Sequence, residues 1–132
     1  MKFTTSLKKN HEFKRLYNKG KSAASKCVVI YCRRNYNTCN KLGVTVSTKI
    51  GGAVQRNRIR RRLKEIYRLN EDILVPGYDI VIVARIKSRY SEYREIESSV
   101  LAMFKKLNLT REPPVSTSAT GNVNIKQDNR SR

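Results

Sequence analysis

The feature that most constrains the fold is residues 53–69, a segment that is both strongly basic and amphipathic. Its sequence is Ala-Val-Gln-Arg-Asn-Arg-Ile-Arg-Arg-Arg-Leu-Lys-Glu-Ile-Tyr-Arg-Leu. At about 100° per residue in an α-helix, Ile59, Leu63 and Ile66 gather on one side. A different arc of roughly 100° holds the polar residues Asn57, Arg60, Arg61, Lys64 and Arg68. The pattern predicts a helix that packs along one side and presents cations along another.

The charges in this helix are almost all of one sign. Seven cationic side chains lie between Arg56 and Arg68, against the single acid Glu65. Solvated helices usually mix signs, so that residues three and four apart attract each other. Here Arg56, Arg60 and Lys64 form a repelling series instead, at a cost of about 0.2–0.5 kcal/mol per pair. Because arginine also carries a flat, permanently charged fork that suits phosphate oxygens, we expect the helix to bind a polyanion.

The net charge is large and unevenly distributed. The 132 residues, a length that suits one domain, include 29 Lys and Arg against 10 Asp and Glu, a net charge of +19. Residues 1–68 hold 19 basic and 2 acidic residues, an excess of 17, whereas residues 69–132 have an excess of only 2. A field of this size attracts nucleic acid or anionic lipid. Membrane attachment is disfavoured because the apolar side of the helix is narrow and carries no Trp.

The compartment and metal content follow from other sequence features. No apolar run approaches the roughly 18–20 residues of a spanning helix, and the first residues lack the apolar core of a signal peptide. The odd set of Cys27, Cys32 and Cys39 contains no CxxC pair, and His11 is the only histidine. We therefore expect a cytoplasmic protein with small, buried or half-buried thiols and no metal site.

The remaining segments predict a mixed fold. A short helix is expected at 10–18, strands at 26–34, 42–47 and 78–85, and a helix from about Ser91 onward. Residues 22–25 lengthen the first strand or form their own, and the polar turn at 35–41 favours antiparallel pairing of 26–34 with 42–47. The run Ile80–Ala84 predicts a central strand buried on both faces. Residues 111–132 change to a polar composition and are expected to be a disordered tail.

These elements predict the α+β class: a small two-layer α-β sandwich in residues 1–110, with an about four-stranded mixed sheet and an open cleft face. Val29, Tyr31 and Arg33 share one side of the first strand, and Val28, Ile30 and Cys32 share the other. With Phe13 and Tyr17 at its margin, the Tyr31 side offers stacking rings and cations together. A single aromatic residue usually belongs to the hydrophobic core. Rings and cations together, however, are suited to binding unpaired nucleotides.

The basic segment also resembles a known family signature. Arg56-Asn57-Arg58-Ile59-Arg60-Arg61, preceded by Lys49-Ile50-Gly51-Gly52-Ala53-Val54, closely resembles the signature of the bacterial ribonuclease P protein subunit. Leu7–Phe13, Val28–Tyr31 and Gly43–Ser47 resemble further segments of that family, so the resemblance spans roughly residues 7–108. Arg60 stands where the family commonly has lysine, and Lys64 where it often has arginine, which exchanges a flat fork for a point charge. Tyr17 replaces a frequent phenylalanine and keeps the ring.

The resemblance implies an accessory role in RNA processing. Ribonuclease P removes the 5′ leader of precursor tRNA, and in bacteria the catalyst is its RNA subunit with bound Mg²⁺. The protein subunit is then expected to bind the catalytic RNA and the leader, and to assist endonucleolytic 5′ maturation at lower Mg²⁺. The family fold also has an uncommon left-handed crossover between parallel strands.

The resemblance assigns residues to two surfaces. On the RNA-binding surface around the signature helix it places Arg56, Asn57, Arg58, Arg60, Arg61 and Lys64. Lys49, at the start of the signature segment, and Arg68, in the same polar arc of the helix, are predicted to belong to this surface too. The leader-binding cleft comprises Phe13, Tyr17, Val29 and Tyr31, and the strand pattern adds Arg33. No residue is assigned a catalytic role, and no metal is assigned to the protein.

The residues themselves argue against a nuclease. The basic half contains only Glu12 and Glu65, in different helices, whereas metal-dependent phosphodiester cleavage usually needs convergent carboxylates. His11 has no evident partner for acid–base chemistry. The expected mechanism is that the positive surface shields two RNA polyanions from each other. A basic ribosomal protein or general RNA chaperone is the alternative, and a DNA-architectural protein is disfavoured because recognition-helix and wedge features are missing.

Overall fold

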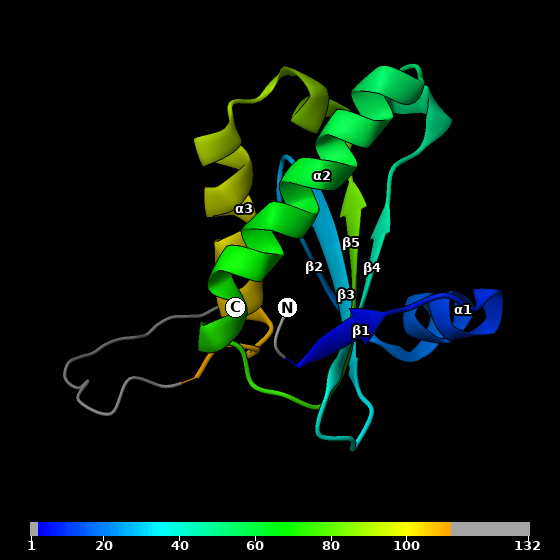
Figure 1. Cartoon of the computed structure of the whole chain (residues 1–132), viewed down its shortest axis with the longest axis vertical. Helices are drawn as coiled ribbons and strands as arrows, with labels where there is room; N and C mark the ends of the chain where they lie inside the picture. Colours follow the sequence, from blue (N-terminus) through cyan, green and yellow to red (C-terminus); the bar gives the residue numbers. More distant parts are fainter. Residues whose placement is uncertain (1–2, 112–132) are drawn as a thin grey trace, which may run out of the picture.

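The computed structural model describes residues 3–111, which form a five-stranded mixed sheet packed by three α-helices (Figure 1). In chain order the elements are β1 (Thr4–Ser6), α1 (Asn10–Lys19), β2 (Lys21–Ala24), β3 (Val28–Arg34), β4 (Asn40–Thr45), α2 (Ala53–Asn70), β5 (Tyr78–Ala84) and α3 (Tyr93–Lys106). Short 3-10 turns lie at Thr48–Ile50, Glu71–Ile73 and Ile86–Tyr90. The mixed class is confirmed, with one strand more than expected. Of the predicted disordered tail at 111–132, only Arg111 lies within the described residues, and there the prediction is wrong, because the backbone N–H of Arg111 donates to the Ile73 carbonyl at 2.7 Å.

β5 is the central strand, as its apolar run predicts. The sheet order is β1-β4-β5-β3-β2, so β5 lies between β3 and β4. Ile82 of β5 is opposite Ile30 of antiparallel β3 and opposite Val44 of parallel β4. The expected direct pairing of 26–34 with 42–47 is therefore wrong. A strand with two apolar faces is best buried between neighbours, and β5 takes that position even though it comes later in the chain.

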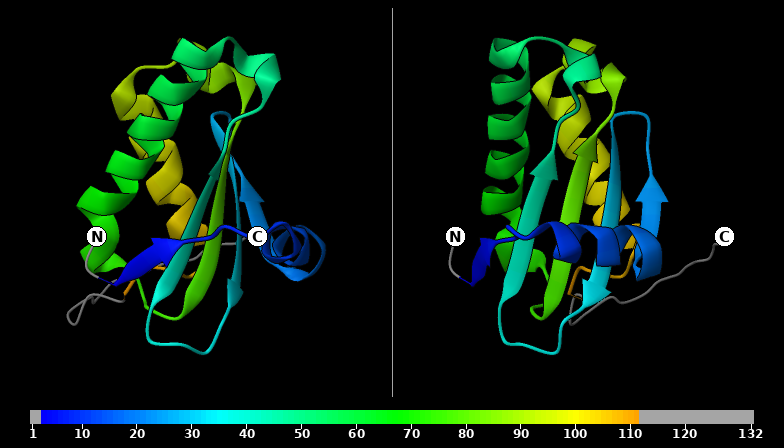
Figure 2. Two further views of the ribbon diagram at one scale, coloured as in Figure 1. Left: turned by 45° about the vertical axis from the view of Figure 1, so that its right-hand side comes forward. Right: turned by 90° about the vertical axis from the view of Figure 1, so that its right-hand side faces the viewer.

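The connection from β4 through α2 to β5 is a crossover between parallel strands. In the right-hand view of Figure 2, seen from the α1 side, both strands point upward, β4 lies to the left of β5, and α2 lies behind the sheet. Seen from the helix side, the chain therefore moves from β4 leftward to β5. This is the left-handed crossover that the family resemblance implies, against the strong general preference for right-handed connections.

The two faces of the sheet are covered unequally (Figure 2). On one face α2 and α3 close the main core, to which Ile59, Leu63 and Phe104 contribute fully buried side chains. On the other face α1 buries a smaller cluster around Leu16 and Val81. Because α1 covers only part of this second face, the remainder is open, as predicted for the two-layer sandwich.

The edge strand β1 was not predicted, and buried polar groups explain its place. β1 pairs in parallel with β4, and the backbone N–H of Phe3 donates to Glu71 Oε2 at 3.2 Å. The Thr4 hydroxyl donates to the same carboxylate and lies 2.9 Å from the Tyr67 hydroxyl. Tyr67 also accepts from Asn40 Nδ2 at 3.1 Å. This network ties the first strand to the C-terminal end of α2.

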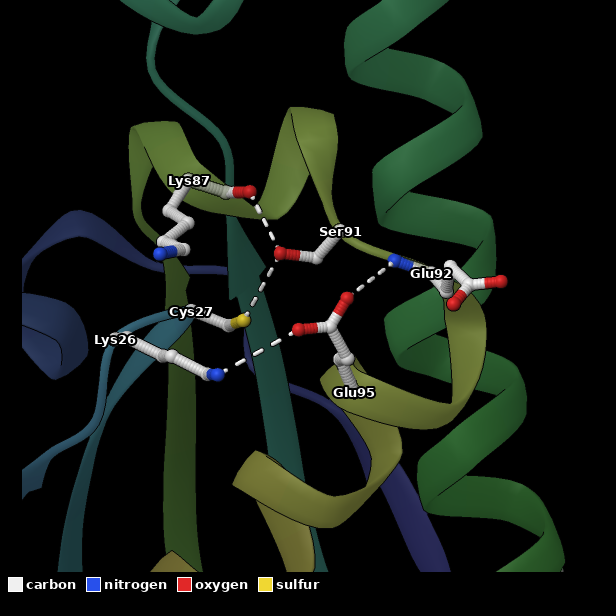
Figure 3. A network of polar contacts seen from close by, with 6 residues as sticks. All are labelled: Lys26, Cys27, Lys87, Ser91, Glu92 and Glu95. Atoms are coloured by element: carbon white, nitrogen blue, oxygen red, sulfur yellow. Dashed lines mark hydrogen bonds and ion pairs between the residues drawn. The ribbon is translucent and has the colours of Figure 1, made fainter.

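The start of α3 differs slightly from the expected position (Figure 3). Glu92 is the N-cap, and its backbone N–H donates to Glu95 Oε1 at 3.2 Å. Ser91 instead donates from Oγ to the Lys87 carbonyl at 2.9 Å and accepts from Cys27 Sγ at 3.4 Å. Ser91 therefore joins the preceding turn to the beginning of β3 rather than capping the helix.

The cysteines are all free. Cys27 and Cys32 are buried as expected, whereas Cys39 is exposed. Burial raises the pKa of the Cys32 thiol to about 11. Within residues 3–111, no group of three or more His, Cys, Asp or Glu side chains is placed to hold a metal ion. In the same range, no helix has the length and apolar character needed to cross a bilayer.

Candidate nucleic-acid interface

The predicted amphipathic helix is α2, and its buried side is the expected one. Ile59, Leu63 and Ile66 are buried in the main core, and Tyr67 joins them. The predicted RNA-binding side chains divide by exposure into two groups: Arg56 and Arg60 are half-buried, and Asn57, Arg58, Arg61, Lys64 and Arg68 are exposed. The burial pattern thus leaves a continuous row of cations along α2.

Contacts within α2 distinguish its cations. Arg60 Nη1 donates to Asn57 Oδ1 at 2.9 Å, which orients the guanidinium along the helix. Arg68 makes a two-point contact with Glu65, through distances of 2.9 and 2.8 Å, and this hydrogen bonding lowers the pKa of Glu65. Arg56 Nε is buried without a hydrogen-bond partner among the described residues. A phosphate that binds Arg56 or Arg60 would therefore displace no carboxylate, whereas at Arg68 it competes with Glu65.

A cation from the turn Ile86–Tyr90, which the sequence did not indicate, contacts the segment before α2. Arg89 Nη1 donates to the Ile50 carbonyl at 2.9 Å. The same nitrogen lies 3.3 Å from the position that a Cβ on Gly51 would occupy, so the glycine leaves room for the guanidinium. Lys49 is exposed on the adjacent 3-10 turn. Arg89 is nearly forty residues away in the chain and its place depends on tertiary contact, so no local pattern could have assigned it.

A second side of α2 faces a shallow depression of about 300 Å³ beside α3. Arg58, Arg61, Arg62 and Glu65 line it together with Tyr93. Arg62 is one of the seven cations between Arg56 and Arg68, but it is not among the residues predicted to bind RNA. Its position extends the cationic surface around the helix toward α3.

The aromatic side chains predicted for the leader come together on the α1 side of the sheet. The rings of Tyr17 and Tyr31 meet edge to face, with centroids 4.9 Å apart and planes at 77°. Phe13 and Tyr31 are half-buried against the cluster of Leu16 and Val81. Tyr17 is 40% exposed, so a ring remains available to a ligand. The alternation in β3 and the spacing in α1 predicted this grouping correctly.

A glycine makes the packing of Phe13 possible. A Cβ built on Gly43 of β4 would lie 2.7 Å from Phe13 Cε1 and 2.8 Å from Cζ, closer than any real side-chain contact. The absence of a side chain at Gly43 therefore lets the ring lie directly against the strand. This close approach fixes α1 on the sheet.

The two other residues predicted for the cleft occupy different places. Val29 lies two residues before Tyr31 on the same side of β3 and is half-buried opposite Val83. Arg33 lies at the far end of β3, opposite Asp79, and is exposed. Its neighbours in a surface depression include Lys19 rather than Val29. Arg33 therefore belongs to a separate part of the surface.

A cationic helix and a sheet face with aromatic side chains, held on one domain, define the class of RNA-binding α/β proteins. Comparison with known proteins agrees with that class. Residues 1–108 match the model of the protein family described as Ribonuclease P. The chain is 45% identical over 109 residues to the ribonuclease P protein component of Alkaliphilus oremlandii, covering 83% of this chain and 96% of that protein. It is 42% identical over 108 residues to that of Clostridioides difficile, covering 81% and 95%.

Solved structures have the same fold. The ribonuclease P protein of Staphylococcus aureus matches with a TM-score of 0.74 and 31% identity, over 80% of this chain and 97% of that one. The ribonuclease P protein of Thermotoga maritima matches with a TM-score of 0.71 and 28% identity, over 76% and 96%. The chain belongs to the ribonuclease P protein family. It is thus a protein component of a tRNA-processing ribonucleoprotein.

Proposed function

We propose that this chain binds the catalytic RNA of ribonuclease P and the 5′ leader of precursor tRNA, and assists leader removal at lower Mg²⁺ in the cytoplasm. The observation that carries the proposal is the pairing of two chemically different surfaces on one small domain: cations along α2, and aromatic rings beside α1 on the other side of the sheet. A general polyanion binder needs only the first surface.

The α2 surface is suited to folded RNA. Its exposed guanidinium groups can bind phosphate oxygens at two points each, and few acids stand near them. Neutralised phosphates release counterions, which makes such binding strongly dependent on salt. By reducing repulsion between the catalytic RNA and its substrate, the same cations reduce the concentration of Mg²⁺ required for assembly.

The Tyr17–Tyr31 surface is suited to an unpaired strand. Base stacking on an aromatic ring tolerates any sequence, because every base has a flat face. A leader varies in sequence between precursor tRNAs, so this type of recognition fits it better than base-specific hydrogen bonds do. Phe13 and Val29 supply apolar contact around the two rings.

We assign the chemistry to the RNA. Carboxylate oxygens are the protein ligands that Mg²⁺ prefers, and residues 3–111 gather no set of three candidate ligands. We propose that the Mg²⁺ that supports phosphodiester cleavage is held by RNA phosphates. The role of this chain is to position the leader and to shield the two RNAs from each other, and we expect no cleavage by the protein alone.

Reconstitution tests the proposal. The full chain is added to the catalytic RNA at low Mg²⁺ with precursor tRNA, and release of the leader is followed over time. We expect rescue of cleavage by the protein with RNA, and none by either component alone. In the presence of the catalytic RNA, affinity should be higher for precursor than for mature tRNA. Equal affinity would instead point to a general RNA chaperone or a ribosomal protein.

A further inference from the structure

A second concave and basic surface lies near the β3–β4 connection. In Figures 1 and 2 this connection is at the end of the sheet opposite the start of α2. The concave surface has a volume of about 330 Å³, which is in the range of small-ligand sites. Its lining includes four cations and two aromatic rings: Lys19, Lys21, Arg33, Arg34, Tyr36 and Tyr78. We call it the Arg34–Tyr36 pocket.

The cations of this pocket have no carboxylate partner among the described residues. Arg33 and Arg34 also line an adjoining depression that contains Glu12 and Asp79, but both acids have other partners there: Glu12 pairs with Lys41 at 2.9 Å, and Asp79 accepts from Asn35 Nδ2 at 2.9 Å. Four positive charges that form no salt bridge repel one another and favour an anion between them. The pocket therefore has the charge of a phosphate site.

The rings add a second type of recognition. The Arg34 guanidinium lies 5.2 Å from the centre of the Tyr36 ring and 5.7 Å from that of Tyr78, within the range of cation–π contact with both. Tyr36 is 83% exposed and has a φ of 60°, a conformation unusual for a bulky residue. The Tyr36 ring is thus held at the surface by a strained backbone conformation.

The loop that carries Tyr36 is fixed by hydrogen bonds. The backbone N–H of Asn37 donates to Asn35 Oδ1 at 2.8 Å, and Asn35 Nδ2 donates to the Cys39 carbonyl at 3.2 Å. The backbone N–H of Asn35 donates to the Gly77 carbonyl at 2.9 Å, which joins the loop to the segment before β5. A ring held in advance loses little entropy when a ligand stacks on it.

We propose that the Arg34–Tyr36 pocket binds one unpaired RNA nucleotide, its base stacked on Tyr36 and its phosphate among the surrounding cations. The proposal rests on the proposed function in that the chain is taken to bind RNA. It adds a third contact, distinct from the aromatic leader surface, since neither Tyr17 nor Tyr31 lines this pocket.

The test is a titration of the full chain, labelled with ¹⁵N, by uridine 5′-monophosphate, with uridine and inorganic phosphate in parallel. We expect saturable shifts in the amide signals of residues 33–36 and 108 with the nucleotide, and much weaker ones with either fragment. Tyr36→Asn removes the ring but tolerates the backbone conformation, and should weaken nucleotide binding about tenfold. Tyr36→Phe should retain binding, and Lys87→Gln, which removes a distant charge, should change little.

Other outcomes would overturn the proposal. Equal binding of inorganic phosphate would reduce the pocket to an anion site, and shifts confined to α2 would place the nucleotide elsewhere. The source of the nucleotide is then sought with Arg34→Gln: weaker binding of the catalytic RNA alone identifies that strand, and a loss seen only with precursor tRNA identifies the leader. Loss with neither would also overturn the proposal. Because leader cleavage is measured separately, failure of the pocket and failure of the proposed function are distinguishable.

Discussion

The Tyr17 ring of α1 stands edge-on to the Tyr31 ring of β3, with centroids 4.9 Å apart. The Tyr17 hydroxyl also lies 3.4 Å from Thr45 Oγ1 on β4. One partly exposed ring is thus held by contacts with two non-adjacent strands. Such a ring is ordered before a ligand arrives, so stacking on it costs less conformational entropy than stacking on a free side chain.

Replacing Tyr17 with Ala should therefore weaken binding of leader-containing substrate by about 1–3 kcal/mol, the range found for single base–aromatic stacks. The measurement is the affinity for precursor against mature tRNA in the presence of the catalytic RNA. Binding of the catalytic RNA alone should not change. Tyr17→Phe keeps the ring and should retain most of the preference for precursor tRNA. A uniform loss for both tRNAs would mean that Tyr17 does not contact the leader.

Gly43 should tolerate no side chain while Phe13 is present. In Gly43→Ala the new Cβ would meet Phe13 Cε1 at 2.7 Å, so the ring must move and α1 with it. We expect the free energy of unfolding to fall by about 1–3 kcal/mol, as for other overpacked sites. Urea unfolding of Gly43→Ala, Phe13→Ala and the double variant gives the coupling between the two positions. If the glycine change costs as much without the Phe13 ring, another contact is responsible.

The sequence predicted those features that depend on local periodicity. Ile59, Leu63 and Ile66 were assigned to the buried side of α2, and Tyr31 to the side of β3 opposite Ile30, and both assignments are confirmed. Helical and strand periods determine which residues share a face.

Features that depend on distant contacts were missed. The pairing of β3 with β4 was wrong because β5, later in the chain, lies between them. The strand β1 is held partly by the buried carboxylate of Glu71, and Arg89, which follows β5 in the chain, donates to the Ile50 carbonyl just before α2. Neither contact leaves a signal within a short window of sequence. The strand period assigns Arg33 to one face of β3. It does not predict which residues of other elements lie next to Arg33.

The cations of α2 should contribute unequally to RNA binding. The double variant Arg56→Gln/Arg60→Gln should weaken binding of the catalytic RNA and reduce the slope of log affinity against log salt by about 1–2. Arg68→Gln is the matched control, because its guanidinium is already paired with Glu65 at two points. Its effect on both quantities should be smaller than half that of the double variant. Fluorescence anisotropy at several salt concentrations measures both, and equal effects per residue would indicate a diffuse field rather than defined contacts.

The ion pair that joins α1 to β4 should make stability depend on pH. Lys41 Nζ donates to Glu12 Oε2 at 2.9 Å, and this hydrogen bond holds the pKa of the Glu12 carboxyl below its ordinary value of 4.5. Because the folded-state pKa is lowered, the stabilisation is complete above about pH 4.5 and is lost as the pH falls through the lowered value. The pKa of Lys41 is raised from 10.5 by the same bond, so the contribution is also lost as alkaline pH passes that raised value.

Urea unfolding of the natural chain and of Lys41→Met, from pH 6 down to pH 3, tests this dependence. The natural chain should be the more stable at pH 6, and the difference between the two should shrink as Glu12 becomes protonated. Lys26→Met is the matched control, since Lys26 and its partner Glu95 are both substantially exposed, at 58% and 42%, and lie 3.5 Å apart. Exposed pairs contribute little, so this variant should differ less from the natural chain at every pH. A difference for Lys41→Met that stays constant down to pH 3 would mean that the lysine stabilises through its apolar stem rather than through Glu12.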